Sequence, residues 1–84
     1  MDIETFLQHF ANQLPNPDEE TLTPGTDFHK LSGWSSLTAL LEMAMIEDEY
    51  QVTLTGADIR GARTLQELFN AIQGERVGSP DKGR

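Results

Sequence analysis

The residues best placed for chemistry are two adjacent serines, Ser35 and Ser36, near the start of the stretch GWSSLTALLEMAMIEDEY. A long apolar and acidic segment follows them, so we expect them to lie where a loop joins a helix. The residue before a helix is best a Ser, Thr, Asp or Asn, because its side-chain oxygen accepts from free backbone N–H groups, and Ser35 meets that need. Ser36 is then the first helical residue, with a hydroxyl open to solvent. A phosphate on that hydroxyl would lie where free N–H groups and the helix dipole favour negative charge, whereas the alternative is a double cap without chemistry.

A catalytic role for Ser36 would require a positioned base, and the two histidines of the chain are the candidates. We expect His9 to be a solvated or half-buried residue of the first helix and His29 to be a loop residue beside Phe28. Neither is expected to serve as the base. Two lone histidines among scattered acids also make no metal site, and no Asp-rich calcium loop occurs. The sequence therefore predicts no catalytic residue and no metal ligand.

Charge and composition narrow the choice of partners. Residues 1–74 contain twelve acids and three bases, and the whole chain has fourteen Asp and Glu against six Lys and Arg. Such a field repels phosphate backbones and anionic membranes and suits partners with basic patches, so we expect neither nucleic acid nor membrane as a ligand. We find no cysteine, no basic-then-apolar leader and no apolar run of membrane-spanning length. We expect a soluble, cytoplasmic, monomeric protein with one small core.

The serines must be positioned by helices, because the apolar residues repeat at helical spacing. The first helix is predicted over residues 2–14, where Asp2 can cap it and Pro15 ends it. Its single apolar stripe contains Ile3, Phe6, Leu7, Phe10 and Leu14. A long loop follows from residue 15 to residue 35, and we expect Phe28 and Leu31 to anchor it.

The same periodicity predicts the later elements. A second helix starts at one of the two serines and runs to about Tyr50, QVTLTG is a short extended connection, and ADIRGA is at most a one- or two-turn helix. The last helix begins at Thr64, whose T-x-x-E spacing to Glu67 predicts a capping box. Its apolar stripe contains Leu65, Leu68, Phe69 and Ile72. We expect one domain over residues 1–73 and a disordered tail over residues 74–84.

The second helix has more apolar surface than a core of this size can bury. At about 100° per residue, one side is expected to face the core and contains Ala39, Met43, Ile46 and Tyr50. A second apolar side, rimmed by Glu47 and Asp48, contains Leu37, Leu40, Leu41 and Ala44. A separate polar strip is expected to contain Thr38, Glu42 and Glu49. The second apolar side is either the ordinary surface of a central helix or a surface for a partner.

The stretch FHKLSGWSSL, followed by EDEYQVTL, resembles the acyl carrier protein and peptidyl carrier protein family, in particular its members with an L-x-G-W-D-S-L signature. The resemblance extends from Phe6 to Ile72. It implies an all-α fold, namely a small four-helix carrier bundle with three main helices, a short third helix and a long first loop. In that family the serine of D-S-L opens the second helix and carries 4′-phosphopantetheine, and Ser36 is the matching residue.

The resemblance implies a carrier protein and not an enzyme. A phosphopantetheinyl transferase would move the arm from coenzyme A to Ser36. The arm would hold acyl or aminoacyl intermediates as thioesters for loading and condensing enzymes of fatty acid, polyketide, peptide or related secondary-metabolite synthesis. The expected partner-binding residues are Trp34, Ser35, Leu37, Leu40, Leu41, Ala44, Glu47 and Asp48. The alternative is a carrier-like acidic helical interaction module without the prosthetic group.

Two features depart from the family pattern. Ser35 stands where the family has Asp; the two residues cap helices about equally well, so the change bears on recognition by the transferase and not on the helix. Thr38 and Leu41 stand where many fatty acid carriers have acids. We therefore expect partners that rely more on apolar contact than the partners of those carriers do.

Overall fold

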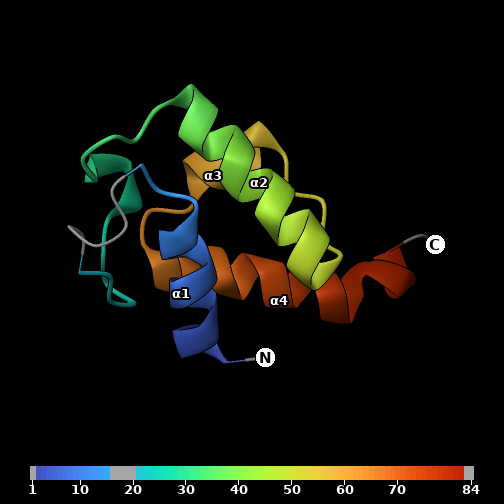
Figure 1. Ribbon diagram of the computed structural model, residues 1–84. Helices are drawn as coiled ribbons and strands as arrows, with labels where there is room; N and C mark the ends of the chain where they lie inside the picture. The colour runs from blue at the N-terminus through green and yellow to red at the C-terminus, as the bar shows by residue number, and fades with distance from the viewer. Residues whose placement is uncertain (1, 16–20, 83–84) are drawn as a thin grey trace.

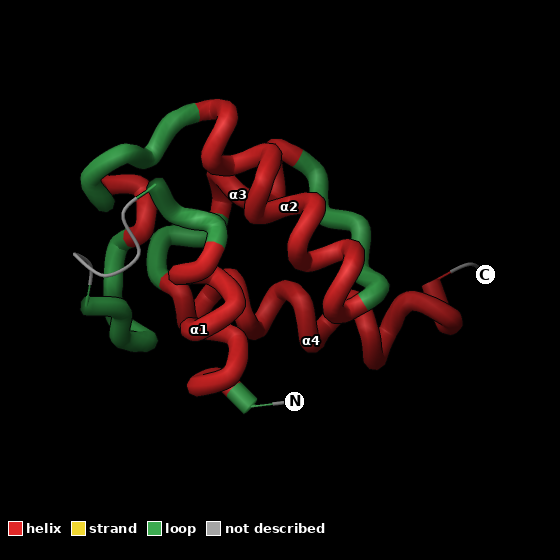
Figure 2. The backbone as a smooth tube through the Cα atoms, viewed as in Figure 1, coloured by secondary structure: helices red, strands yellow, loops and turns green. Residues whose placement is uncertain are grey.

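The computed structural model describes residues 2–15 and 21–82, with side chains as far as Glu75. The described elements are α1 (Ile3–Asn12), the 3₁₀ helix η2 (Phe28–Lys30), α2 (Ser36–Tyr50), α3 (Gly56–Gly61) and α4 (Leu65–Lys82) (Figure 1). Figure 2 shows η2 as a short helical interruption of the long loop between α1 and α2. No strand occurs among the described residues. The predicted all-α fold, with three main helices and a short third helix, is confirmed.

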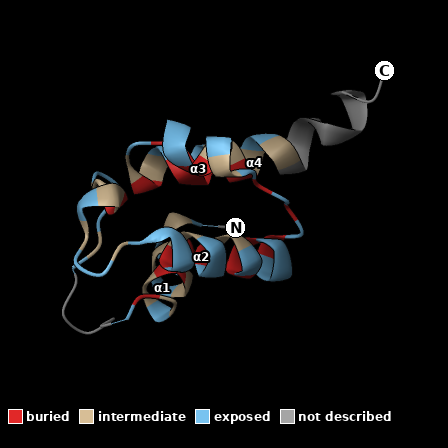
Figure 3. Cartoon of the chain, turned by 90° about the horizontal axis from the view of Figure 1, so that it is seen from above, coloured by how far each residue is buried: buried red, intermediate tan, exposed pale blue. Residues whose placement is uncertain are grey.

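The three main helices pack against one another, and α3 packs on α4. Figure 3 shows the exposed residues of α2 and α4 mostly on the outer sides of the two helices. The side chains that fill the interior come from all the described helices and from the connection between α2 and α3, and the largest apolar ones that are fully buried are Phe6, Phe10, Phe28, Ile46, Leu65, Leu68 and Ile72. Burial of each such side chain is worth about 1.5–3 kcal/mol, so this interior supplies the main driving force for the fold.

Side-chain caps set where the helices begin. The Asp2 side chain accepts from the backbone N–H of Thr5 at 2.8 Å, as predicted for the start of α1. Before α4, the Thr64 hydroxyl accepts from the N–H of Glu67 at 3.2 Å. The Glu67 carboxylate, however, accepts from the N–H of Arg63 at 2.8 Å, one residue earlier than in the predicted reciprocal box. The start of α4 is therefore correct, and the partner of Glu67 is not the predicted one.

The long first loop is fixed to the start of α4 by backbone hydrogen bonds. The N–H of Leu65 donates to the Thr26 carbonyl at 3.1 Å, and the N–H of Gln66 donates to the Pro24 carbonyl at 2.8 Å. These bonds use N–H groups of the first turn of α4, which have no partner within the helix. A loop that precedes α2 is thus tied to the last helix.

Aromatic rings anchor the same loop from the inside. Phe28 is fully buried and Leu31 is half-buried, as predicted. The ring of Phe10 in α1 lies 5.7 Å from the ring of Phe28 and stacks on the ring of Trp34 at 6.0 Å, centroid to centroid. The chain segment that leads into α2 is therefore held by α1.

The last helix is longer than its apolar stripe. α4 is assigned as far as Lys82, whereas the stripe ends at Ile72. Extending an existing helix requires no new nucleus, so a helix can run past the residues that its apolar stripe identifies. The domain boundary at residue 73 stays a prediction.

Candidate functional site

The start of α2 uses the two serines differently. Ser35 has extended backbone, with φ −155° and ψ 175°, and its hydroxyl accepts from the N–H of Thr38 at 3.2 Å. Ser36 is the first helical residue, and it is exposed. One hydroxyl therefore caps the helix, and the other is open to solvent at the end where the helix dipole favours negative charge.

Thr38, a residue of the predicted polar strip, holds the turn before α2. Thr38 is 4% exposed, and its hydroxyl donates to the Gly33 carbonyl at 2.9 Å. Gly33 has φ +81°, and a Cβ at that position would lie 2.9 Å from Pro15 Cγ. The left-handed conformation and the close approach both favour glycine at this position. Thr38 and Gly33 together fix the path by which the chain enters α2.

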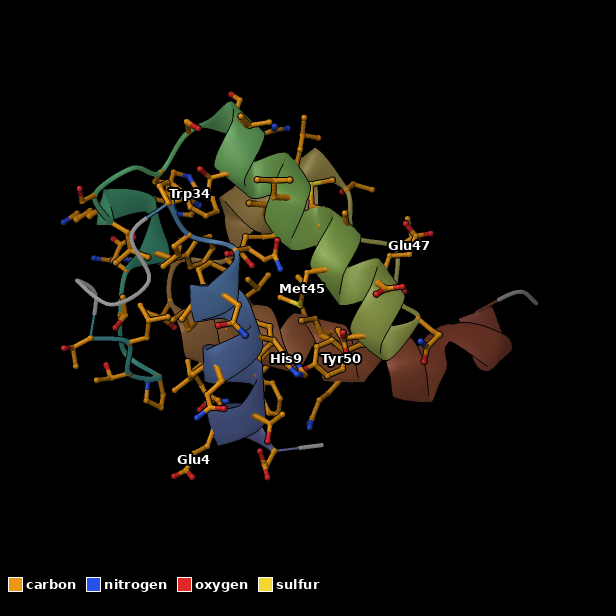
Figure 4. All side chains as sticks on the ribbon, viewed as in Figure 1. Glu4, His9, Trp34, Met45, Glu47 and Tyr50 are labelled. Carbon is orange, nitrogen blue, oxygen red and sulfur yellow. The ribbon has the colours of Figure 1, made fainter. Side chains whose placement is uncertain are left out.

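The outer surface of α2 is apolar at its first turns. Leu37 is 65% exposed, Leu40 is 59% exposed and Leu41 is 44% exposed, and Ala44 is also exposed. We call these four residues the leucine face. Glu47 and Asp48 are exposed beyond it on the same helix, and Figure 4 shows Glu47 on the side of α2 away from α1. The second apolar side predicted for this helix is thus left open to solvent.

A groove of about 540 Å³ lies between α2 and α3 and begins at the serines. Its walls are mostly apolar, and its lining residues are His29, Trp34, Ser35, Ser36, Ala39, Leu40, Met43, Gly56, Ile59 and Arg60. Cavities of this size commonly accept small molecules or cofactors in proteins. The sequence did not predict the groove, because its two sides come from helices that no sequence pattern brings together.

Trp34 belongs to the interior side of this site. It is half-buried, and its ring lies edge-on to Phe28 at 5.2 Å and to His29 at 5.9 Å, in addition to its stacking on Phe10. Figure 4 shows Trp34 between the first loop and the start of α2. Trp34 therefore connects the aromatic interior to the groove, which it lines together with the two serines.

The two histidines do not lie with Ser36 as a base would. His9 is half-buried, and its Nδ1 lies 2.8 Å from the Tyr50 hydroxyl, which ties α1 to the end of α2 (Figure 4). His29 lines the groove, but its Nε2 donates to the Ile59 carbonyl at 3.0 Å and its Nδ1 faces Asp27 at 3.6 Å. His29 therefore joins the first loop to α3.

The inner side of α2 differs from the prediction. Ile46 and Tyr50 are buried as expected, but Ala39 and Met43 are only half-buried. The predicted polar strip is wrong at Thr38 and Glu42, which are buried, whereas Glu49 is exposed. The helical spacing of Thr38, Glu42 and Met45 places them on one side, and packing against α1 and α4 turns this side inward.

Glu42 is the unusual residue of this inner side. It is fully buried, and neither carboxyl oxygen has a hydrogen-bond partner among the described residues. Burial raises the pKa of Glu42 to about 9, because the charged form would lose its hydration. Glu42 is therefore a neutral carboxylic acid at pH 7. The sequence signal for this burial is helical spacing, because Glu42 lies one turn after Thr38 and one turn before Ile46.

Comparison with known protein families identifies the family to which this chain belongs. The family model described as the phosphopantetheine attachment site matches residues 4–72. The chain belongs to the phosphopantetheine attachment-site family. No curated protein and no solved structure matches the chain in the corresponding comparisons. The carrier domain is thus a non-catalytic carrier, and the family's cofactor is covalently attached 4′-phosphopantetheine.

The residues of the carrier domain fit this cofactor. Ser36 offers an exposed hydroxyl at the N-terminus of α2, next to free backbone N–H groups that favour a phosphate. The groove that begins at Ser36 has apolar walls for an uncharged chain. When bound, the arm supplies a thiol that holds an acyl group as a thioester. The chain itself is then required to position the arm and to present it.

The described residues hold no competing metal centre. They contain no group of three His, Cys, Asp or Glu side chains arranged to hold an ion. In the same part of the chain, no helix is long and apolar enough to cross a membrane.

Proposed function

We propose that Ser36 carries the 4′-phosphopantetheine arm and that the domain tethers acyl or aminoacyl intermediates on it as thioesters. The domain presents these intermediates to partner enzymes of fatty acid, polyketide or related secondary-metabolite synthesis. The different surroundings of the two serines support Ser36 as the attachment residue. The Ser35 hydroxyl accepts from the N–H of Thr38, whereas Ser36 is exposed and does not cap the helix.

The attachment step requires little from the carrier domain. Ser36 Oγ forms a bond to the β-phosphorus of coenzyme A, the bond from that phosphorus to 3′,5′-ADP breaks, and the hydroxyl proton passes to a base of the transferase. His29 lines the same groove as Ser36, but its ring nitrogens face the Ile59 carbonyl and Asp27, and His9 pairs with the Tyr50 hydroxyl. The base therefore belongs to the transferase, and the domain supplies an accessible hydroxyl at a helix N-terminus.

The leucine face is the proposed docking surface for partner enzymes. Exposed leucines on neighbouring turns form an apolar patch beside Ser36, and such patches commonly mark sites of protein contact. Glu47 and Asp48 add negative charge at the far end. The complementary partner surface is an apolar depression with basic side chains at one edge. Its apolar centre would supply affinity, and its charges would orient the carrier domain.

Attachment is tested by intact mass after incubation with coenzyme A and a broad-specificity transferase. The parent should gain one phosphopantetheine, and Ser36→Ala should gain none while its helix content stays unchanged. Ser35→Asp is the matched variant, and it should still be modified because Asp also caps helices. A parent without added mass would favour the unmodified interaction module, and an arm mapped to a peptide through Ser35 would contradict the assignment.

A further inference from the structure

The groove between α2 and α3 contains a cation to which the proposed function gives no role. Arg60 lines the groove together with Ser36, and it is exposed at its surface. The carrier domain is strongly acidic, with twelve acids and three bases in residues 1–74. The Arg60 guanidinium therefore places a positive charge in the same groove as Ser36, in a domain whose net charge is strongly negative.

The other cations of the described residues are placed differently. Arg63 lies 4.0 Å from Asp27 and is not part of the groove lining, and Lys30 does not line the groove either. His29 lines it, but the Ile59 carbonyl and Asp27 occupy its two ring nitrogens. The ion pairs found among the described residues both involve Asp27 and leave Arg60 out.

The lack of a side chain at Gly56 leaves the space in which the Arg60 guanidinium lies. A Cβ at Gly56 would lie 3.0 Å from Arg60 Nη1, so the side chain folds back along α3 and rests against the bare backbone of the first turn. Gly56 and Arg60 both line the groove. The guanidinium therefore lies along the groove wall, where a group attached to Ser36 can meet it.

We infer that Arg60 is the counter-ion of the phosphodiester that joins the arm to Ser36, and that it holds the arm along the α2–α3 groove. This inference rests on attachment at Ser36. A phosphodiester has one negative charge and two free oxygens, and a guanidinium can donate to both at once. The apolar walls formed by Trp34, Met43 and Ile59 then receive the uncharged part of the arm. The held arm keeps its thiol close to the protein until a partner draws it out.

The arm thiol offers a direct measurement, because the chain has no cysteine and the loaded protein therefore contains a single thiol. Loading is first followed to completion by intact mass. The alkylation rate is then measured with iodoacetamide, which is uncharged and is not attracted or repelled by the field of the protein. Arg60→Gln should react about two- to fivefold faster than the parent, in line with the loss of one partly exposed ion pair. The alkylation rate of Arg60→Lys should lie between those of the parent and of Arg60→Gln, because lysine keeps the positive charge but not the two parallel N–H donors of the guanidinium.

Arg63→Gln is the matched control, since it removes one positive charge from the exposed surface outside the groove. Its alkylation rate should equal that of the parent. A second readout needs no variant: the Nε–Hε signal of Arg60 in the NMR spectrum should shift between the unloaded and the loaded parent. Added sodium chloride should also raise the rate of the parent and leave that of Arg60→Gln almost unchanged.

The two proposals fail in different ways. A parent that gains no arm at Ser36 overturns both. A fully loaded parent whose Arg60 signal does not move, or an Arg60→Gln variant that reacts at the rate of Arg63→Gln, overturns the role of Arg60 and leaves the attachment at Ser36 intact.

Discussion

The leucine face and the part of the inner side of α2 that contains Thr38 and Glu42 have polarities opposite to those of most helices. Leu37, Leu40 and Leu41 are exposed on the outside, whereas Thr38 and Glu42 are buried on the inside. A surface helix normally turns its apolar stripe to the core and its charges to water. In α2, four apolar residues face solvent while a carboxylic acid lies in the interior.

The comparison shows which features of α2 the fold does not explain. The exposed part of the leucines adds nothing to folding, and a buried carboxyl group without a partner opposes it. Thr38 is different, because its buried hydroxyl has a partner in the Gly33 carbonyl and holds the entry to α2. The leucine face is therefore the proposed surface for contact with other proteins. The burial of Glu42 lowers the stability of the carrier domain, and this loss can be measured.

A large, pH-dependent effect is expected from Glu42→Gln. The pKa of Glu42 lies near 9 in the folded chain and near 4.5 in the unfolded chain. Its protonated form is therefore favoured by folding, so its contribution to stability is complete below pH 4.5 and is lost as the pH rises toward 9. The free energy of unfolding of Glu42→Gln, relative to the parent, should rise by about 3 kcal/mol between pH 5 and pH 7.

Urea unfolding followed by the fluorescence of Trp34 measures this difference, because Trp34 stacks on Phe10 in the folded chain. Glu49→Gln is the control, since it removes a carboxyl from the exposed part of the same helix. If the relative stability of Glu42→Gln is the same at both pH values, Glu42 is not a buried neutral acid.

The next effect separates the two sides of α2 by placing the same charge on each. Leu41→Asp should leave the free energy of unfolding nearly unchanged and weaken docking to a partner enzyme by about 1–3 kcal/mol, the usual cost of losing an apolar interface anchor. Met45→Asp buries a charge on the inner side and should destabilise the fold by several kcal/mol, on the order of 3 or more.

Thermal melting and a transfer assay on both variants make the comparison. The docking role of the leucine face is refuted if Leu41→Asp melts as low as Met45→Asp. It is equally refuted if Leu41→Asp melts and transfers like the parent with every partner tested.

The smallest expected effect is that of Thr38→Val, which keeps the shape of the side chain and removes its hydroxyl. Thr38 is buried and the bond from its hydroxyl to the Gly33 carbonyl is part-buried, so loss of this bond should lower the free energy of unfolding by about 1 kcal/mol. Thr53→Val is the control, because the Thr53 hydroxyl donates to Glu47 at the exposed surface, and it should change stability by less than about 0.5 kcal/mol. Equal effects of the two variants would show that Thr38 does not hold the turn.

Local signals in the sequence were enough to predict the helices and the cap at the start of α2. The cap at Asp2, the start of α2 and its end at Tyr50 all follow from residue types within one helical turn. The start of α4 at Thr64 follows in the same way. The use of Ser35 as the cap, which leaves Ser36 exposed, needed no knowledge of the rest of the chain. Such signals survive because a cap and its N–H partner lie three residues apart.

The tertiary structure decided which sides of the helices face one another. Helical spacing places Thr38, Glu42 and Met45 together but does not state which side faces α1 and α4, and residue polarity indicated the wrong side. The groove depended equally on tertiary contacts, because Ser36 comes to it from α2 and Arg60 from α3. Periodicity determines which residues share a side of a helix, whereas the loops and the packing of the other helices determine what that side contacts.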